Sequence, residues 1–273
     1  MPKLEITTRW STAEIYLHGA HVTQFKHHDE PPLLFLSQCS RFEKDAPIRG
    51  GIPIIFPWFG KPAGRPGQHG FARNRDWALK EIHSPADGAV SVRLALPPGP
   101  EPADGQIAVE YAVHVADTLS VELTVRNHSP RDFHFENCLH TYFAVGDIHA
   151  VNVAGLQGVE YLDQPAGFAR RTETDTAIRF ADEVDRAYLH TRHAVDIHDP
   201  SLRRTLRVEK EGSDSTVVWN PWMAKAKAMP DFGDEEYRCM VCVESGNVAD
   251  NRITLASGQS ATLKIKLRSA PLK

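Results

Sequence analysis

Two residues far apart in the chain could together carry out proton transfer. His140 follows an apolar run that ends at Leu139, and Glu244 ends a second apolar run at residues 241–243. A β-sandwich can bring two such strand ends onto one concave surface, where imidazole and carboxylate form a general acid–base pair. The carboxylate would favour the imidazolium and raise the pKa of His140, which keeps an acid available near neutral pH. The alternative is a structural histidine and a solvated glutamate at a strand end.

A pair of arginines flanks a segment rich in glycine and proline. Residues 48–60 read IRGGIPIIFPWFG and residues 68–73 read QHGFAR, so Arg49 precedes and Arg73 follows an apolar run. Glycines permit sharp turns and close approach of a ligand, and prolines stop a central strand. We expect a rigid loop that holds both guanidinium groups near one spot, where they suit a phosphate or a carboxylate. The alternative is that each arginine caps a strand end and faces water.

Other groups have the residue types of a metal site, but we expect no metal. Cys239 and Cys242 have the spacing of zinc and redox motifs. Residues three apart on a strand point to opposite faces, so core packing is expected for both. Residues 27–30 precede two prolines and predict an exposed turn. A third candidate group contains His190, His193, Asp196 and His198. Part of it falls on a predicted strand with one solvent-exposed face, and the sequence specifies neither the number nor the geometry of metal ligands.

Strands must position these residues, because the dominant hydrophobic period is two. Apolar and polar side chains alternate over residues 107–115 and 119–125, and the three residues between them predict a hairpin turn. Similar alternation predicts strands over residues 14–22, 91–96 and 261–268. Each pattern places one face on a core and one in water, as in antiparallel sheets. We therefore expect an all-β fold, a single large antiparallel β-sandwich.

Length and composition are those of an ordinary globular chain. The 273 residues are 41% hydrophobic and 24% charged, which fits one domain over residues 1–273. The net charge of -4 gives no indication of a basic surface for binding nucleic acid. Neither a signal peptide nor a membrane-spanning run of about 18 apolar residues is found. With four sparse cysteines, a reduced, cytoplasmic protein is expected, and we expect it to be a monomer.

Seven segments in chain order resemble the hexose-6-phosphate mutarotases. These proteins are the glucose-6-phosphate 1-epimerases, a branch of the aldose 1-epimerase superfamily. The segments are GAHVTQF (19–25), IRGGIPIIFPWFG (48–60), HGFARNRDW (69–77), HTYFAVGDI (140–148), VDRAY (184–188), VVWNPW (217–222) and VCVESGNV (241–248). The resemblance implies a galactose mutarotase-like fold, a large antiparallel β-supersandwich. It also implies interconversion of the α and β anomers of glucose 6-phosphate and related aldohexose 6-phosphates.

The resemblance also implies residue roles. His140 matches the catalytic histidine and Glu244 the catalytic glutamate. The matching substrate-binding positions are Arg49, Gln68, His69, Arg73 and, in a shorter motif, Asp185. An aromatic wall for the sugar ring is expected to include Trp219. For Trp219, as for Trp58, Phe143 and Trp222, core packing is the alternative.

These roles give a mechanistic hypothesis for a phosphorylated hexose as the small-molecule partner. Glu244 as carboxylate takes the proton of the anomeric hydroxyl, and His140 as imidazolium protonates the ring oxygen. The roles reverse on ring closure, and no cofactor is required, in keeping with the lack of a nucleotide-binding glycine fingerprint. Two alternatives remain: a non-catalytic carbohydrate-binding or regulatory module on the same fold, or a mutarotase for free aldoses. The acid–base couple argues against the first and the two arginines against the second.

Overall fold

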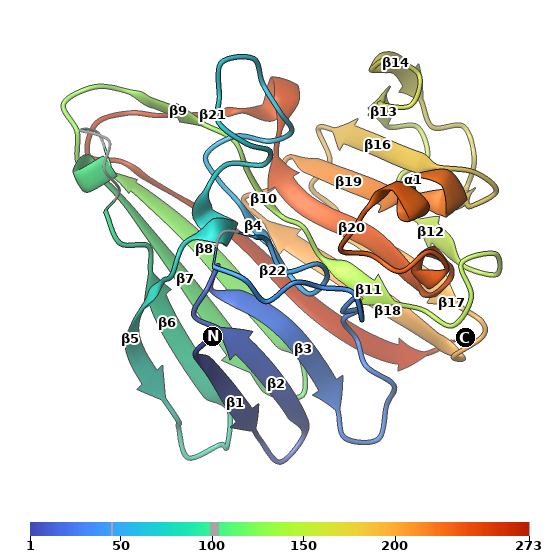
Figure 1. The fold of residues 1–273 in the computed structure, drawn as a ribbon, viewed down its shortest axis with the longest axis horizontal. Coiled ribbons are helices and arrows are strands. Elements are labelled where there is room, and N and C mark those ends of the chain that lie inside the picture. The colour runs from blue at the N-terminus through green and yellow to red at the C-terminus, as the bar shows by residue number, and fades with distance from the viewer. Residues whose placement is uncertain (45, 99–103, 273) are drawn as a thin grey trace.

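The computed structural model describes residues 1–44, 46–98 and 104–272 and is built from strands in four sheets (Figure 1). The three-stranded sheet has the order β1 (Lys3–Thr7), β2 (Ser11–Tyr16), β3 (His21–His27). The nine-stranded sheet has the order β15 (Ala177–Arg179), β12 (Asn152–Ala154), β17 (Val195–Asp199), β18 (Arg204–Glu211), β22 (Ser260–Pro271), β8 (Leu119–Asn127), β7 (Ile107–Val115), β6 (Val90–Ala95), β5 (Ala78–His83).

The eight-stranded sheet carries most of the site. Its order is β14 (Ala169–Thr172), β13 (Glu160–Asp163), β16 (Val184–Leu189), β19 (Ser215–Asn220), β20 (Met240–Asn247), β10 (Asn137–Leu139), β4 (Ile54–Ile55), with β11 (Tyr142–Ala144) also paired to β20. A two-stranded sheet joins β21 (Ile253–Leu255) to β9 (Phe133–Phe135).

Helical segments are short. The α-helix of the described part of the chain is α1 (Trp222–Ala228), and single 3₁₀ turns are η1 (Ala72–Asn74), η2 (Asp104–Gln106), η3 (Glu236–Cys239) and η4 (Ala249–Asn251). None of the helices formed by the described residues has the length and apolarity needed to cross a membrane.

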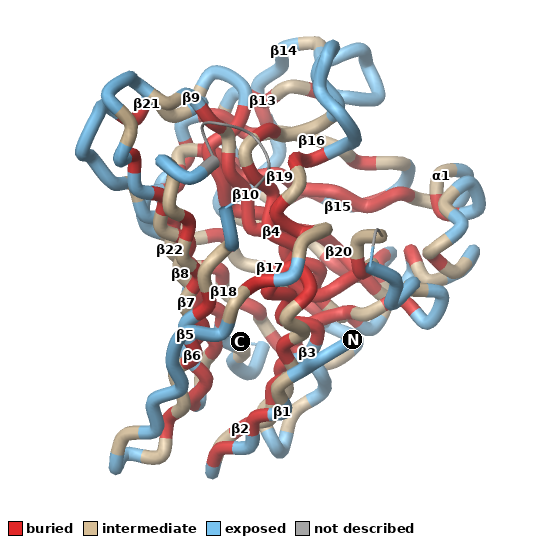
Figure 2. The backbone as a smooth tube through the Cα atoms, turned by 60° about the vertical axis from the view of Figure 1, so that its left-hand side comes forward, coloured by how far each residue is buried: buried red, intermediate tan, exposed pale blue. Residues whose placement is uncertain are grey.

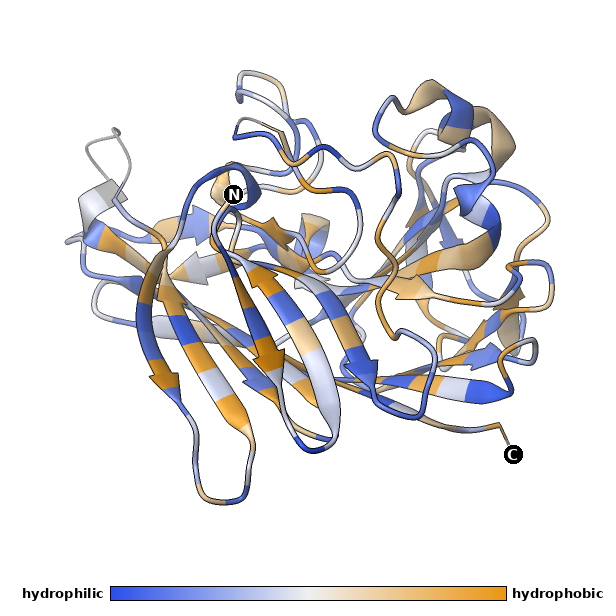
Figure 3. Cartoon of the chain, turned by 60° about the horizontal axis from the view of Figure 1, so that its bottom comes forward, coloured by the Kyte–Doolittle hydropathy of each residue, from blue (hydrophilic) through white to orange (hydrophobic). Residues whose placement is uncertain are grey.

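The predicted antiparallel all-β architecture is confirmed. The strand pairs of the two large sheets are antiparallel. The predicted hairpin is formed by β7 and β8, with Val115 opposite Leu119 across the three-residue turn. Figure 3 shows hydrophobic and hydrophilic residues alternating along strands of the sheets, as expected where one face of a sheet packs on the core.

The core lies between the sheets. One cluster of buried apolar side chains includes Ile15 from β2, Tyr111 from β7, Ile197 from β17 and Val243 from β20. Figure 2 shows buried segments through the middle of the sheets and exposed segments at hairpin ends and loops. This shared core fixes the two large sheets against each other, so strand ends from distant parts of the sequence keep a constant relation.

The predicted strand over residues 14–22 is wrong, because a turn interrupts it. The chain reverses at Gly19 and Ala20, which have φ of +73° and +46°, and continues as β3. A Cβ on Gly19 would lie 2.7 Å from the carbonyl oxygen of Arg73. Only glycine permits this approach, and the β2–β3 turn therefore packs against the backbone that carries Arg73.

Candidate active site

His140 and Glu244 meet because of strand register. Strands β10 and β11 both pair with β20, with Leu139 opposite Ser245 and Tyr142 opposite Cys242. The same antiparallel register places residue 140, in the gap between β10 and β11, opposite residue 244. Both side chains are on the face that lines a cavity, and the predicted meeting of the two residues is present in the structure.

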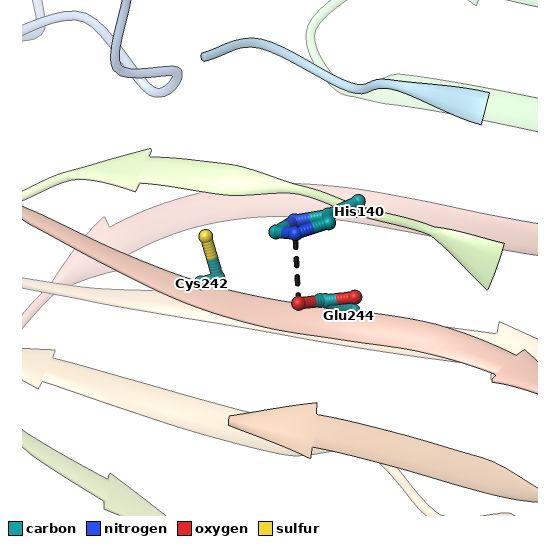
Figure 4. A group of neighbouring side chains, drawn as sticks. All are labelled: His140, Cys242 and Glu244. Carbon is teal, nitrogen blue, oxygen red and sulfur yellow. Dashed lines mark ion pairs between the residues drawn. The ribbon is translucent and has the colours of Figure 1, made fainter. Parts of the chain in front are cut away.

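The two side chains are in direct contact. His140 Nδ1 lies 3.2 Å from Glu244 Oε1 (Figure 4), although the contact is not aligned as a hydrogen bond. The imidazole stacks on Tyr142 at a centroid distance of 4.7 Å and 11° between planes. The other carboxylate oxygen, Oε2, accepts a hydrogen bond from the Cys138 thiol at 3.4 Å. The pair is therefore held from both sides.

Burial shifts the pKa values of both members of the pair. His140 is 7% exposed and Glu244 is 1% exposed. Burial, reinforced by His69 and the positive charges of Arg73 and Arg49, lowers the pKa of His140 well below its usual value. Burial raises the pKa of Glu244 well above its usual value, and the negative charge of Asp185 adds to this. The expectation that the carboxylate raises the pKa of His140 is wrong, because desolvation outweighs the attraction.

The two arginines line the same cavity but differ in their charge compensation. The Arg49 guanidinium holds Asp231 through Nε at 3.2 Å and Nη2 at 3.1 Å, and its Nη1 donates to the Tyr142 hydroxyl at 3.0 Å. Arg73 is only 8% exposed, and its Nη2 donates to the Gln68 carbonyl at 2.9 Å. Its Nε has no hydrogen-bond partner, and no ion pair with a carboxylate is found for Arg73 within the described residues. Burial lowers the pKa of Arg73 to about 10, so it stays charged near neutral pH.

The loop after Arg49 brings these groups together, as predicted. The run from Ile52 to Phe56 is buried, and Gly70 has φ of +70°. A Cβ on Gly70 would lie 1.9 Å from the Phe56 carbonyl oxygen, so the two limbs of the loop touch. The alternative in which both arginines face water is excluded, because Arg73 is buried and the partly buried Arg49 pairs with Asp231.

His69 is a neutral donor on the cavity wall. Burial, with the charges of Arg73 and Arg49, lowers its pKa to about 3. The backbone N–H of Gly60 donates to Nδ1 at 3.1 Å, so the proton of the neutral ring lies on Nε2. That nitrogen lies 3.0 Å from Gln68 Nε2. Two N–H groups cannot bond each other, so a hydrogen bond here requires the amide to present its oxygen to the ring. Gln68 and His69 thus form a polar edge that can bind hydroxyl groups.

Asp185 and Trp219 form the opposite side of the cavity. They lie opposite each other in the register of β16 and β19. Burial raises the pKa of Asp185 to about 6, even though Lys225 opposes this shift. The Lys225 ammonium lies 3.4 Å from Asp185 Oδ2 and 6.0 Å from the centre of the Trp219 ring. The two side chains offer a carboxylate and an aromatic face to a ligand.

All eight residues predicted for the site line one cavity of about 630 Å³. They are His140, Glu244, Arg49, Arg73, Gln68, His69, Asp185 and Trp219. Of the other aromatic candidates, Phe143 is fully buried in the core, and Trp222 packs on Tyr237 at 5.3 Å between ring centres. A cavity of this size suits a small molecule.

Four residues that contact or adjoin the predicted site residues were not predicted from the sequence. Tyr142 follows His140 by two residues in the segment HTYF, and the alternation of a strand could have placed it on the same face. By the same alternation Cys242 lies on the Glu244 face of β20, as Figure 4 shows. Asp231 and Cys138 reach the site through the tertiary fold and have no comparable sequence signal. Cys239 lies in η3 rather than on a strand, so the expected reason for its separation from Cys242 is wrong.

Known proteins are similar to this chain over most of its length. The aldose 1-epimerase family model matches residues 2–268. A protein from Cenchrus ciliaris named "Putative glucose-6-phosphate 1-epimerase" is 40% identical over 95% of this chain and 82% of its own. A protein of the same name from Escherichia coli is 35% identical, over 88% of this chain and 81% of its own length.

Solved structures support the same relationship. The crystal structure of a "putative mutarotase" from Salmonella typhimurium superposes with a TM-score of 0.90 at 32% identity, covering 98% of this chain and 90% of that chain. A galactose mutarotase-like protein from Clostridium acetobutylicum, at 15% identity and a TM-score of 0.75, covers 99% of this chain and 95% of its own and has the same fold. The chain belongs to the aldose 1-epimerase family.

Proposed function

We propose that this protein is a hexose-6-phosphate mutarotase that interconverts the α and β anomers of glucose 6-phosphate and related aldohexose 6-phosphates. The observation that carries the proposal is the contact of 3.2 Å between His140 and Glu244 in a cavity that also exposes Arg73 to a ligand. The names of the relatives specify glucose 6-phosphate, and an arginine without a carboxylate partner suits a phosphate.

Mutarotation requires only proton transfers and a bond rotation. Glu244 as carboxylate takes the proton of the O1 hydroxyl while His140 as imidazolium gives a proton to the ring oxygen O5. The C1–O5 bond breaks, O1 becomes the aldehyde oxygen, and rotation about C1–C2 presents the other face of the carbonyl. Closure reverses both transfers and restores the original protonation. Each positioned group contributes typically about 10²–10⁴-fold to such a reaction.

The reactive charge state needs the proton on His140 rather than on Glu244. Burial lowers the pKa of His140 and raises the pKa of Glu244, which favours the proton on Glu244 before the sugar binds. Moving that proton across the 3.2 Å contact produces the imidazolium and the carboxylate without any exchange with solvent. A bound phosphate would compensate the charge of Arg73, which is one cause of the lowered pKa of His140. Phosphate binding therefore favours the reactive form.

The remaining residues orient the sugar. Arg73 anchors the 6-phosphate, while Arg49, already neutralised by Asp231, supplies directed N–H donors. His69 and Gln68 bind hydroxyl groups on one edge, and Asp185 accepts on the other. Trp219 offers a face to the ring. This assignment separates phosphate binding from the reacting carbon, as orientation of a substrate requires.

Anomeric exchange tests the proposal. Magnetisation exchange between the α and β anomers of glucose 6-phosphate is measured by NMR with and without the protein, and Glu244→Gln serves as the matched control. An increase in the exchange rate that is absent for Glu244→Gln supports the proposal. No increase for any sugar would favour a carbohydrate-binding module, and an increase for free galactose alone would favour a mutarotase of free aldoses.

A further inference from the structure

A third side chain with metal-binding capacity touches the acid–base pair. Cys242 and Glu244 are two residues apart on β20 and lie on the same face, and His140 lies across from Glu244. A ligand atom of each residue (a ring nitrogen of His140, the Cys242 sulfur and a carboxylate oxygen of Glu244) lies within 4.8 Å of the other two (Figure 4). The proposed proton transfers do not use the thiol, so they do not explain why it lies beside the acid–base pair.

The three donors match the preferences of one class of cation. Thiolate, imidazole and carboxylate are the ligands that Zn²⁺ takes in proteins, at about 2.0–2.3 Å, and catalytic zinc sites combine three such ligands with one open position. Ligand atoms around a tetrahedral ion at these distances lie roughly 3.5 Å apart. Rotamer adjustments of about 1 Å would bring the present spacing to that value. Soft thiolate also disfavours Mg²⁺ and Ca²⁺, which prefer oxygen.

The imidazole is available for coordination. His140 Nδ1 is buried and has no hydrogen-bond partner, although it points toward Glu244. An unpartnered buried nitrogen is unusual, and in the neutral ring it can present a lone pair. The thiol of Cys242 is fully buried and makes no hydrogen bond that involves the described residues. Coordination would therefore cost neither donor a hydrogen bond, although the thiol must release its proton and the imidazole must exchange its contact with Glu244 for the ion.

We propose that His140, Cys242 and Glu244 form an inhibitory site for a thiophilic divalent cation, with Zn²⁺ as the preferred ion. His140 and Glu244 line the cavity, so the ion would enter from there and direct its fourth position to water. Occupancy removes the nitrogen and the carboxylate from proton transfer. Inhibition rests on the proposed mutarotase function, whereas binding of the ion does not.

The chain provides a matched control for the thiol. Cys138 is also fully buried and also touches Glu244, but through Oε2 and outside the group of three. Cys242→Ser and Cys138→Ser each replace one sulfur with oxygen at nearly constant volume. Each variant is compared with its own activity without metal, and circular dichroism verifies folding. Cys242→Ala serves as a second variant where serine destabilises the strand.

Two measurements test the site on reduced protein in a chelator-free buffer that contains no phosphate. The first is titration with Co²⁺, read by the charge-transfer absorption of a cobalt–thiolate bond. We expect this absorption in the wild type and in Cys138→Ser and its loss in Cys242→Ser. Its absence from the wild type, or its persistence in Cys242→Ser, would overturn the proposal.

The second measurement is inhibition of glucose 6-phosphate anomeric exchange by Zn²⁺. Since even outer-shell partners of a metal contribute about 10–100-fold in affinity, Cys242→Ser should need at least about tenfold more Zn²⁺ for half inhibition than Cys138→Ser. Equal sensitivity of the two variants would contradict an inhibitory role for this site. If the protein shows a cobalt–thiolate band but does not accelerate anomeric exchange, the metal site is supported. The same result would refute the proposed mutarotase function.

Discussion

His140 lies opposite Glu244, in the gap between two strands that pair with β20 in one antiparallel register. The register that joins Leu139 to Ser245 and Tyr142 to Cys242 fixes this relationship through backbone hydrogen bonds. The distance of 3.2 Å between the imidazole and the carboxylate is therefore set by the strand register as well as by side-chain packing. Because β10 and β11 leave residues 140 and 141 outside the regular ladder, the imidazole reaches the cavity without breaking the strand pairing.

Removing either member of the pair should abolish most turnover. For Glu244→Gln and for His140→Asn we expect the accelerated exchange of glucose 6-phosphate to fall by about 10²–10⁴-fold, since each removes one positioned proton-transfer group. The double variant should lose little more than either single variant, because the two residues act as a unit. Anomeric exchange by NMR measures all three. Near-normal rates in a folded single variant would refute the assignment.

Arg73 and Arg49 should differ in their effect on phosphate binding. Arg73 has no ion-pair partner among the described residues, whereas Arg49 is neutralised by Asp231. Arg73→Gln should raise KM for glucose 6-phosphate by roughly 10–100-fold, since a hydrogen bond to a charged group is worth about 1.5–3 kcal/mol. KM for free glucose should change little. Arg49→Gln is the comparison variant, and equal changes for both sugars with Arg73→Gln would exclude a phosphate role.

Asp185 should make sugar binding sensitive to mild acid. Burial raises the pKa of this carboxyl from 3.8 to about 6, so it is ionised above pH 6 and protonated below it. KM for glucose 6-phosphate should therefore rise as the pH falls through 6. The phosphate of the sugar also titrates near pH 6, so the informative quantity is the difference between wild type and Asp185→Asn. The variant should show a higher KM with a shallower dependence on pH, and identical profiles would contradict the prediction.

His21 should reduce stability in acid. This histidine is fully buried beneath the loop of Arg49, and its Nε2 lies 2.7 Å from the Gly50 carbonyl oxygen. Burial lowers its pKa from 6.5 to about 4. The folded-state pKa lies below the unfolded value, so the contribution to stability is fully present above pH 6.5. It is lost progressively as the pH falls from 6.5 to 4, by roughly 3 kcal/mol in total.

Urea unfolding at pH 7.5, 6 and 5 measures this dependence. His21→Gln removes the titrating group, so its free energy of unfolding should be lower at neutral pH and should fall less steeply toward pH 5. The difference in slope should approach about 1.4 kcal/mol per pH unit below pH 6. Parallel slopes for variant and wild type would show that His21 does not contribute.

Two glycines of the loop at residues 60–70 should respond differently to alanine. Both have positive φ, but a Cβ on Gly67 meets open space and one on Gly70 would overlap the Phe56 carbonyl oxygen. Gly67→Ala should cost about 1–2 kcal/mol of stability, the strain of a left-handed L-residue, and should retain exchange activity. Gly70→Ala should cost more and should displace His69 from the cavity. A thermal melt and the exchange assay measure both, and equal behaviour would contradict the packing argument.

The sequence predicted the strands well where alternation was uninterrupted. The hairpin of β7 and β8 follows from period-two patterning and a three-residue turn, both local properties. The expected strand over residues 14–22 failed because the turn at Gly19 and Ala20 lies within a pattern that stays apolar on both sides. The glycine is needed there for an approach to Arg73, a contact that no local pattern reports.

The sequence predicted which residues form the site, but it did not predict the ion-pair partner of Arg49 or the direction of the pKa shift of His140. The resembling segments contain seven of the eight predicted residues that line the cavity, and Gln68 directly precedes one of them. Spacing alone could not show that His140 faces Glu244. The Asp231 partner of Arg49 was not foreseen, because the two residues meet only through the fold. The lowered pKa of His140 was also not predicted, since burial is a tertiary property.

The contact between Gly19 and the Arg73 carbonyl oxygen has a consequence for protein engineering. The small N-terminal sheet carries none of the eight predicted site residues. Its β2–β3 turn nevertheless supports the backbone that places a buried cation. Redesign of this turn, with the rest of the sheet kept for the core, is therefore expected to reduce selectivity for charged sugars without touching the acid–base couple.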